Sequence, residues 1–315
     1  MSGVQDVTAS PGKSAIVMVL AIPDYGKAKP KILDLCGKLD ALVRSQLNRF
    51  PGSATGTVIA FGAEAWPRLF PDRPVPDELQ PFEPIVGEKH VAPSTPGDIF
   101  IHVRSARMDV CQQLAGIISQ ALDGAVEPID ETHGFRNFDG RAIVGFVDGT
   151  ENPTGDDTET FATIAPAKTG QADFSGGSYV FIQKYLHDIK GWEALPVEEQ
   201  EKAIGRRKYD DLELPDGAKP ENAHNAVTNI KAEDGSELKI VRANIPFANA
   251  SRGEYGTYFL GYAGKFSTTR RMLQNMFVGD PPGNADRLLD FSKAVTGTLF
   301  FAPSPDLLAD LAENG

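Results

Sequence analysis

The sequence is poor in cysteine and histidine, with two cysteines and five histidines in 315 residues. Neither Cys36 nor Cys111 belongs to a CxxC or CxxCH motif or to a cluster of cysteines and histidines. A zinc ribbon, an iron–sulfur cluster and covalently attached c-type haem are therefore excluded, because each needs such ligands at fixed spacing. We predict that both cysteines are buried as small apolar residues. A disulfide is the alternative, which a cytosolic location would disfavour.

Long apolar runs and an excess of positive charge are also missing. No stretch approaches the ~20 apolar residues that a membrane helix needs. Lys and Arg number 31 against 43 Asp and Glu, so the formal net charge of -12 repels nucleic acid and anionic membrane surfaces. We expect neither as a partner. The first residues carry no basic segment ahead of an apolar run, so we expect no signal peptide and a cytoplasmic protein.

Hydrophobic periodicity divides the chain into two similar halves. In the first half, strand-like segments and helical segments alternate in a βαββαβ order, provided that residues 141–147 form the last strand. The other strands are expected at residues 14–21, 56–61 and 98–103, and the helices at 28–50 and 108–122. The second half repeats this plan, with strands at residues 178–185, 238–243, 255–262 and 298–302 and helices at 196–205 and 269–277. We predict an α+β protein made of two ferredoxin-like halves.

The predicted boundaries are residues 10–150 for the first half and 178–312 for the second. Residues 151–177 lie between them and are rich in Gly, Thr and Asp without apolar periodicity. They form either a linker or a long functional loop.

Asp148 ends the segment RAIVGFVD in line with apolar side chains. If residues 141–147 are a strand, alternation places Val144, Phe146 and Asp148 on one face. Gly149 follows, which suits an acid presented at a cavity wall. The alternative is an Asx-type turn that closes the strand.

Arg242 shares a predicted strand face with Leu238 and Ile240. A guanidinium in such a core-facing position needs compensation, because burying an unpaired charge is expensive. Arg242 therefore either pairs with a carboxylate as a structural element or lines a polar pocket.

Among the histidines, His224 stands out by its position. It ends an irregular stretch at residues 208–225 and begins a short β-like segment eighteen residues before Arg242, so one hairpin could bring both near a single cavity. A ligand role stays open for it on these grounds. His102 and His187 are expected to be structural or solvated. His90 and His133 lie in polar turns, and the sequence around them shows no candidate partner residues.

Several motifs in order along the chain resemble a known family. They are GFVDGTENP at 145–153, GGSYVFIQKY at 176–185, IGRRK at 204–208, IVRANIPF at 240–247 and TGTLFFAPS at 296–304. With the His224 segment, they are similar to dye-decolourising peroxidases of the bacterial cytoplasmic class. The resemblance implies haem b in the second half, and antiparallel sheets that form a β-sandwich or barrel-like core of the dimeric α+β barrel type. It also implies one-electron oxidation of small organic or dye-like donors by H2O2, through a ferryl intermediate.

The resemblance also assigns roles. His224 corresponds to the proximal ligand of the haem iron, with Asp286 as the acceptor for its other ring nitrogen and Asp290 as the weaker candidate. Asp148 corresponds to the distal acid that moves a proton between the peroxide oxygens. Arg242 corresponds to the arginine that stabilises the departing oxygen, and both are expected to be catalytic without an order between them. Asn244 corresponds to a distal amide that orders water.

Further residues are implied to lie against the haem. Arg206 corresponds to an arginine near the haem propionates, although Arg207 stands where relatives often have threonine. Phe259 corresponds to a phenylalanine that narrows the distal pocket, and simple core packing is its alternative. The remaining contacts implied by the GFVDGTENP motif are Gly149, Thr150 and Glu151. A narrow pocket would not admit bulky donors, so electrons from such donors would enter through an oxidisable residue near the surface or through a propionate edge of the haem. Four residues are candidates for this relay, and none of them is assigned: Tyr185, Trp192, Tyr209 and Tyr255.

Two other functions remain open at this stage. A haem-binding, storage or delivery protein would use His224 and show only incidental peroxidase activity. A cofactor-free oligomerisation module would keep Asp148 and Arg242 as a buried ion pair. In either case we expect a homo-oligomer, a dimer or larger. No cargo peptide for a protein compartment is evident after the last predicted strand, so encapsulation is possible but unsupported.

Overall fold

The first half of the chain forms the predicted βαββαβ unit. In this computed structural model, which describes residues 4–166 and 172–315, its main elements are β1 (Ser14–Ala21), α1 (Tyr25–Arg49), β2 (Gly56–Gly62), β5 (Ile99–Ser105), α3 (Met108–Ala121) and β6 (Glu127–Phe135). The strands are antiparallel and lie in the order β2-β5-β1-β6. Between β2 and β5 the chain forms α2 (Ala65–Leu69) and the hairpin of β3 (Ile85–Val86) and β4 (Val91–Ala92).

The strand predicted at residues 141–147 is wrong, and β6 closes the unit instead. Residues 141–147 fold into a tight loop with an Arg141–Val147 β-bridge and a hydrogen bond of 2.8 Å from the backbone N–H of Ala142 to the carbonyl of Phe146. Gly140, Gly145 and Gly149 adopt positive φ angles of 108°, 91° and 84°, which interrupt an extended strand. Strand alternation therefore does not determine where the side chain of Asp148 points.

The second half repeats the same order of strands. Its elements are β7 (Ser178–His187), α5 (Ile189–Glu193), α6 (Val197–Ile204), α7 (His224–Thr228), β8 (Ile230–Lys231), β9 (Glu237–Leu238), β10 (Val241–Arg242), β11 (Ile245–Asn249), β12 (Glu254–Ala263), α8 (Phe266–Phe277), β13 (Ser292–Ala294), β14 (Thr298–Ala302) and α9 (Pro305–Asn314). The strand order β10-β12-β7-β14 matches that of the first half. The strand predicted at residues 238–243 is broken into β9 and β10, and the β-like segment expected at His224 is the helix α7.

One antiparallel sheet connects the two halves. β14 pairs with β2 through Phe300↔Gly62 and Phe301↔Phe61, which joins both sets of strands in one ten-stranded sheet. At the two ends of this sheet, Gly134 of β6 lies against the side chain of Ile245 of β11. The approach is so close that a Cβ atom added to Gly134 would lie 1.7 Å from that side chain. No β-ladder joins β6 to β11 within the described ranges, so the sheet is not a closed barrel. The α+β class with antiparallel pairing is confirmed.

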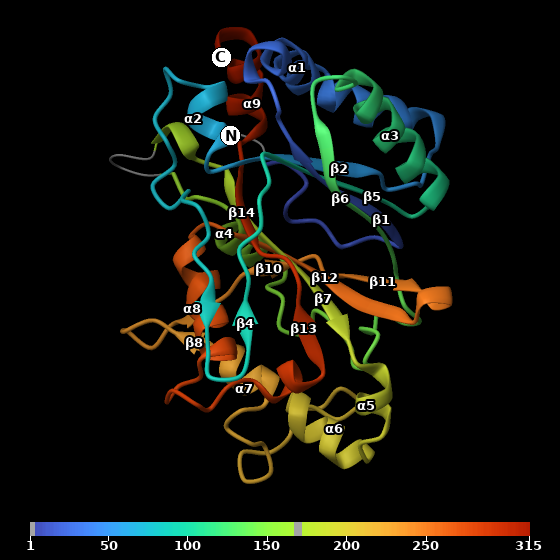
Figure 1. The fold of residues 1–315 in the computed structure, drawn as a ribbon, viewed down its shortest axis with the longest axis vertical. Coiled ribbons are helices and arrows are strands. Elements are labelled where there is room, and N and C mark those ends of the chain that lie inside the picture. Colours follow the sequence, from blue (N-terminus) through green and yellow to red (C-terminus); the bar gives the residue numbers. More distant parts are fainter. Residues whose placement is uncertain (1–3, 167–171) are drawn as a thin grey trace.

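The sheet separates two apolar cores. Alternate residues of β1 show this, because Ile16 and Met18 join the core under the helices while Val17 and Val19 join the core inside the curved sheet. Figure 1 shows α1, α3 and α9 gathered at one end of the molecule and α5, α6 and α7 at the other. The site described below lies at the second end.

The remaining expectations about the fold concern the cysteines and the central loop. Cys36 and Cys111 are buried and unpaired, as predicted. The loop predicted at residues 151–177 contains the helix α4 (Asp157–Ala162) and the 3-10 turn Ala172–Phe174, while its residues 167–171 lie outside the described part. Among the described residues, the helices are too short or too polar to cross a membrane.

Candidate functional site

A largely apolar cavity lies in the second half, between one face of the sheet and the helices α6, α7 and α8. Its apolar lining consists of Ala142, Val144, Phe146, Val147, Tyr185, Ile204, Ile240, Phe259, Met272, Leu273, Met276, Leu288 and Leu289. Nine residues singled out from the sequence line it, namely Asp148, Gly149, Thr150, Glu151, Arg206, His224, Arg242, Asn244 and Phe259. The fold therefore brings together residues that are far apart in the sequence.

His224 enters the cavity from the first turn of α7. Its Nδ1 lies 2.6 Å from Oδ2 of Asp286, whose carboxylate is 1% exposed. The other oxygen of Asp286 accepts a hydrogen bond of 2.9 Å from the backbone N–H of Leu288, which fixes the carboxylate. A buried carboxylate at this distance holds the imidazole with its proton on Nδ1. Nε2 then carries a free lone pair, and no described residue forms a hydrogen bond with it.

The weaker candidate, Asp290, does not contact His224. It lies 3.2 Å from Nε2 of His90, outside the cavity. Asp286 is thus the residue that orients His224, because it alone of the two reaches the imidazole.

Asp148, Arg242 and Asn244 form a second polar region of the cavity, which we call the polar wall. Nδ2 of Asn244 donates to Oδ1 of Asp148 at 3.2 Å, while Oδ1 of Asn244 accepts from the backbone N–H of Leu260 at 3.3 Å. No described backbone N–H donates to the Asp148 carboxylate, which argues against the Asx-type turn. Oδ2 of Asp148 has no hydrogen-bond partner among the described residues and is available to a ligand.

Arg242 lacks the carboxylate partner that a structural ion pair would require. No ion pair of Arg242 occurs within residues 4–166 and 172–315. Asn152 holds it instead, since Oδ1 of Asn152 accepts from the Arg242 backbone N–H at 3.1 Å and from Nε at 3.4 Å, and Nδ2 of Asn152 donates to the Arg242 carbonyl at 2.7 Å. The guanidinium therefore lines a polar pocket, one of the two alternatives.

Sequence reasoning missed Asn152 as a site residue. It belongs to the GFVDGTENP motif, but its partner Arg242 lies ninety residues further along the chain. Nothing in the local pattern shows that this amide meets β10.

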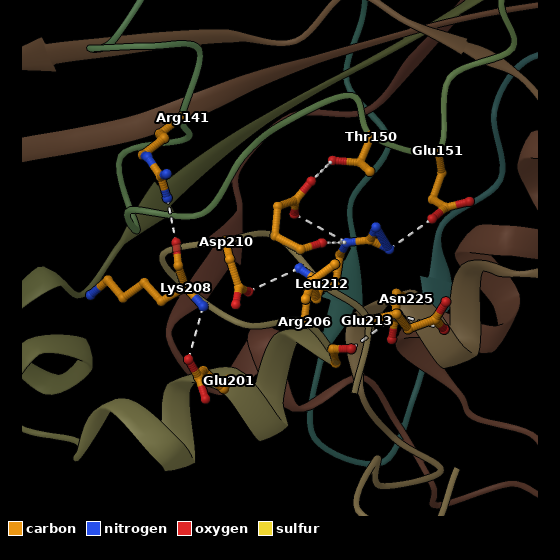
Figure 2. A network of polar contacts seen from close by, with 12 residues as sticks. Arg141, Thr150, Glu151, Glu201, Arg206, Lys208, Asp210, Leu212, Glu213 and Asn225 are labelled. Atoms are coloured by element: carbon orange, nitrogen blue, oxygen red, sulfur yellow. Dashed lines mark hydrogen bonds and ion pairs between the residues drawn. The ribbon is translucent and has the colours of Figure 1, made fainter. Parts of the chain in front are cut away.

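Arg206 connects the loop after Asp148 with the segment after α6 (Figure 2). Its Nη1 donates to Glu151 at 2.9 Å and its Nε to Asp211 at 3.1 Å, while Thr150 donates to the second oxygen of Asp211 at 2.6 Å. The guanidinium is already shared by two protein carboxylates and stays near the cavity. Arg207 points elsewhere, with an exposed side chain 3.5 Å from Asp210.

Phe259 both lines the cavity and belongs to the core, because its ring packs 6.4 Å from that of Phe181.

Of the four oxidisable residues, only Tyr185 lines the cavity, and its hydroxyl donates to Gln183. Trp192 is buried and donates to the carbonyl of Val144 at 2.9 Å, and Tyr209 is 78% exposed. The structure does not bring these aromatic residues together.

His187 was expected to be structural or solvated, but it also lines the cavity. Its Nδ1 lies 2.8 Å from Oγ of Ser292 and its Nε2 lies 2.9 Å from Oγ1 of Thr257. Burial lowers the pKa of His187 to about 4, so the imidazole is neutral near pH 7. Both ring nitrogens of His187 thus have hydrogen-bond partners, whereas among the described residues His224 has a partner at Nδ1 alone.

The donor set fits an iron porphyrin better than a bare metal ion. Within the described ranges, no three His, Cys, Asp or Glu side chains lie close enough to hold an ion. A single imidazole with a free Nε2 in an apolar cavity suits an iron whose other ligands come from a macrocycle. Arg206 at the edge offers a cation for the carboxylates of such a group.

Family models match both halves of the chain. The model described as "Dyp-type peroxidase, N-terminal" matches residues 7–136, and "Dyp-type peroxidase, C-terminal" matches residues 139–307. Together they account for most of the sequence.

Relatives and solved structures agree with these models. A dye-decolorizing peroxidase from Mycobacterium tuberculosis is 48% identical over 304 residues, which are 96% of this chain and 89% of the relative. The cryo-EM structure of the encapsulated DyP-type peroxidase from Mycobacterium smegmatis has a TM-score of 0.94 at 48% identity and covers 98% of both chains. A variant of DypB from Rhodococcus jostii, solved in complex with heme, has a TM-score of 0.91 at 44% identity over 97% of this chain and 99% of that one.

Proposed function

The chain belongs to the Dyp-type peroxidase family, and from this premise we propose which of its residues carry the reaction. As a member, it is a haem-binding peroxidase that uses H2O2 to oxidise an electron donor. For a phenolic donor the reaction is H2O2 + 2 ArOH → 2 H2O + 2 ArO•, so each donor gives up one electron and one proton. The family match does not support the alternative of a haem storage or delivery protein, nor a module without a cofactor.

We propose that the group is haem b and that Nε2 of His224 is its protein ligand. When bound, the haem would supply the redox chemistry, which is the transfer of two electrons to peroxide and their recovery from donors one at a time. The observation that carries this proposal is the buried Asp286 carboxylate 2.6 Å from Nδ1 of His224, with Nε2 left without a partner. Asp286 makes the imidazole a stronger electron donor, because it partly accepts the Nδ1 proton.

The polar wall is proposed to act on the peroxide. Asp148 takes the proton from one peroxide oxygen and returns it to the other, so that the second oxygen leaves as water. The fixed charge of Arg242 stabilises the negative charge that develops on the departing oxygen. Asn244 holds Asp148 through Oδ1, which leaves Oδ2 free for the proton.

The rest of the cavity is proposed to hold the haem in place. Arg206, assisted by Thr150 and Glu151, faces the haem carboxylates, and Gly149 leaves room beside Asp148. Phe259, which lines the cavity, would narrow the space that the haem leaves free. The apolar residues exclude water, which strengthens the electrostatic effects of the polar wall.

The test is the absorption spectrum of the purified protein after hemin addition, followed by one equivalent of H2O2. The wild type is expected to give a Soret band that peroxide converts to a second defined spectrum. His224→Ala is expected to lose or shift the Soret band, while the control His90→Ala, which removes a histidine outside the cavity, keeps it. A band that peroxide only bleaches, or one that His224→Ala leaves unchanged, would contradict the proposal.

The location and assembly of the protein form a separate part of the proposal. We propose a cytoplasmic homo-oligomer whose subunits are built from the halves 10–150 and 178–312 joined by residues 151–177. Val86 and Val91 support a contact between copies, because both are exposed apolar residues on the β3–β4 hairpin. The likeness to an encapsulated relative is the one support for encapsulation. Light scattering coupled to gel filtration measures the number of subunits, and a monomer would contradict the proposal.

A further inference from the structure

A groove on the surface shares the polar wall with the cavity. Three segments form its sides. They are Thr8 to Ala15, the end of β6 with the loop after it, and β10 with the start of β11. Asp148, Arg242 and Asn244 line both the groove and the cavity, together with Val147 and Gly149. A molecule bound in the groove therefore lies directly behind the polar wall.

The groove is cationic in a strongly acidic protein. Its lining contains four cationic side chains, Lys13, Arg136, Arg141 and Arg242, against the two carboxylates of Asp139 and Asp148. The whole chain carries a formal net charge of -12. This local reversal of charge attracts anions to a surface that adjoins the polar wall.

Two of these cations have no carboxylate within ion-pair distance in the described part of the chain. No ion pair involves Lys13 or Arg136 within the described ranges, and the Arg136 guanidinium donates only to the backbone carbonyl of Asp139 at 2.7 Å. The carboxylate of Asp139 is already taken by Arg141 at 2.9 Å. A bound anion can therefore pair with Lys13 and Arg136 without displacing a carboxylate of the protein.

The groove also offers apolar surface to an aromatic ring. Phe135, at the end of β6, is 38% exposed, an unusual exposure for a large apolar side chain. Ile245 and Pro246 line the groove as well. An apolar floor with a cationic rim fits a flat ring that bears one negative group.

We propose that this groove binds an aromatic carboxylate as an electron donor of the enzyme, with its carboxylate at Lys13 and Arg136. The inference rests on the proposed peroxidase function and adds the chemical class and the place of the donor. Such a donor would give up its electron from the groove, across the polar wall, without entering the narrow cavity.

The kinetic test compares two phenols that differ in charge alone. 4-Hydroxybenzoate carries the carboxylate, and methyl 4-hydroxybenzoate replaces it by a neutral ester. The double variant Lys13→Gln/Arg136→Gln is expected to raise KM for 4-hydroxybenzoate up to about tenfold, since it removes two charged contacts from exposed side chains. KM for the ester and the rate of the spectral change with H2O2 are expected to stay within about twofold, because neither uses these charges.

Two controls separate the local charge from other effects. Lys38→Gln/Arg252→Gln removes the same net charge outside the groove and should leave both KM values unchanged. Lys13→Arg/Arg136→Lys keeps the charge in the groove and should keep KM low. Equal effects of the groove and control variants on 4-hydroxybenzoate, or equal effects on both donors, would overturn the proposal.

Binding without turnover gives an independent readout. Saturation-transfer NMR on the haem-loaded protein, without peroxide, should detect 4-hydroxybenzoate, and binding should weaken in Lys13→Gln/Arg136→Gln and at high salt. If the wild type binds 4-hydroxybenzoate but peroxide causes no spectral change, the proposed function fails while the groove stands. If the ester is oxidised but 4-hydroxybenzoate does not bind the groove, the inference fails alone.

Discussion

Asn152 is the residue on which the position of Arg242 depends. Its amide makes three hydrogen bonds to the backbone and Nε of Arg242, and it follows Asp148 by four residues. One side chain thus links the loop that carries the proposed acid with the strand that carries the proposed cation. We regard Asn152 as a positioning residue, since its amide is engaged with Arg242 and it does not line the cavity.

We predict that Asn152→Ala lowers kcat/KM for H2O2 by about 10- to 100-fold, because a small misplacement of a catalytic group is costly. Asp148→Asn, which removes the proton carrier, is expected to lower it by about 10²- to 10⁴-fold. Stopped-flow measurement of the spectral change with peroxide gives both rates.

A purely structural role of Asn152 would affect other steps as well. The rate at which donors reduce the peroxide-treated enzyme should fall much less than the rate of the reaction with peroxide. Asn249→Ala, at the end of β11, serves as a control amide outside the site. A variant Asn152→Ala that slows the donor step as much as the peroxide step would contradict the positioning role.

The residues of the site could be predicted mainly through the family motifs. Asp148 and Arg242 were also selected from the sequence alone, but the strand alternation offered for Asp148 does not exist. Its carboxylate reaches the cavity through a glycine-rich loop. His187 and Asn152 could not be found, because their positions depend on partners 70 to 105 residues away.

At the scale of elements, buried apolar segments were predicted well and polar edges were not. β1 and β14 have the predicted bounds, since both are continuous apolar runs in the sheet. β6 was missed because it is an edge strand with the sequence EPIDETHGF, in which only Thr132 and Gly134 are buried. α7 was missed because five residues are too short to show a helical period.

The loop between β6 and α4 gives a prediction about backbone conformation. Gly149 has a φ of 84°, and an added Cβ would lie 3.5 Å from Nδ2 of Asn152. Gly149→Ala is expected to cost about 1 kcal/mol of stability, because an L-residue is strained at this φ. The 3.5 Å distance is an ordinary van der Waals contact, so the effect comes from the strained backbone next to Asp148, which should also slow the reaction with peroxide about tenfold.

Gly155→Ala is the matched control for Gly149→Ala. Gly155 has a φ of 62°, and its added Cβ would meet no atom within 4 Å. Chemical denaturation should show a similar loss of stability in both variants, whereas stopped flow should show slower peroxide reaction in Gly149→Ala alone. Equal activities of the two variants would mean that the conformation of Gly149 does not position the polar wall.

For the whole molecule, the continuous sheet determines which side chains face each other. β7 pairs with β12 on one side and with β14 on the other, and β14 joins the first half through β2. Alternate residues of β7 and β12 therefore face either the cavity or the core inside the curved sheet. The duplication predicted from the sequence gives this strand order, but the junction of β14 with β2 depends on contacts more than two hundred residues apart.

The two buried histidines on opposite faces of this sheet lead to a prediction about stability and pH. Burial lowers the pKa of His187 to about 4 and that of His102 to about 3, with Arg104 adding to the effect on His102. Both imidazoles are neutral in the folded protein, whereas an unfolded chain protonates them near pH 6.5. The unfolded state thus binds more protons below this pH, so the free energy of unfolding is highest above about pH 6.5 and falls as the pH drops toward the folded pKa values.

A difference of one unit between the folded and unfolded pKa corresponds to about 1.36 kcal/mol. By about pH 4, protonation of each histidine in the unfolded chain is therefore expected to lower the free energy of unfolding by about 3 kcal/mol. Urea unfolding at several pH values measures this slope. His187→Gln should flatten it by about half, since glutamine keeps a polar group opposite Ser292 and Thr257 but does not titrate. Asn249→Ala, which removes a side chain that does not titrate, should leave the slope unchanged. A variant His187→Gln with the same pH slope as the wild type would show that this histidine is already protonated in the folded protein.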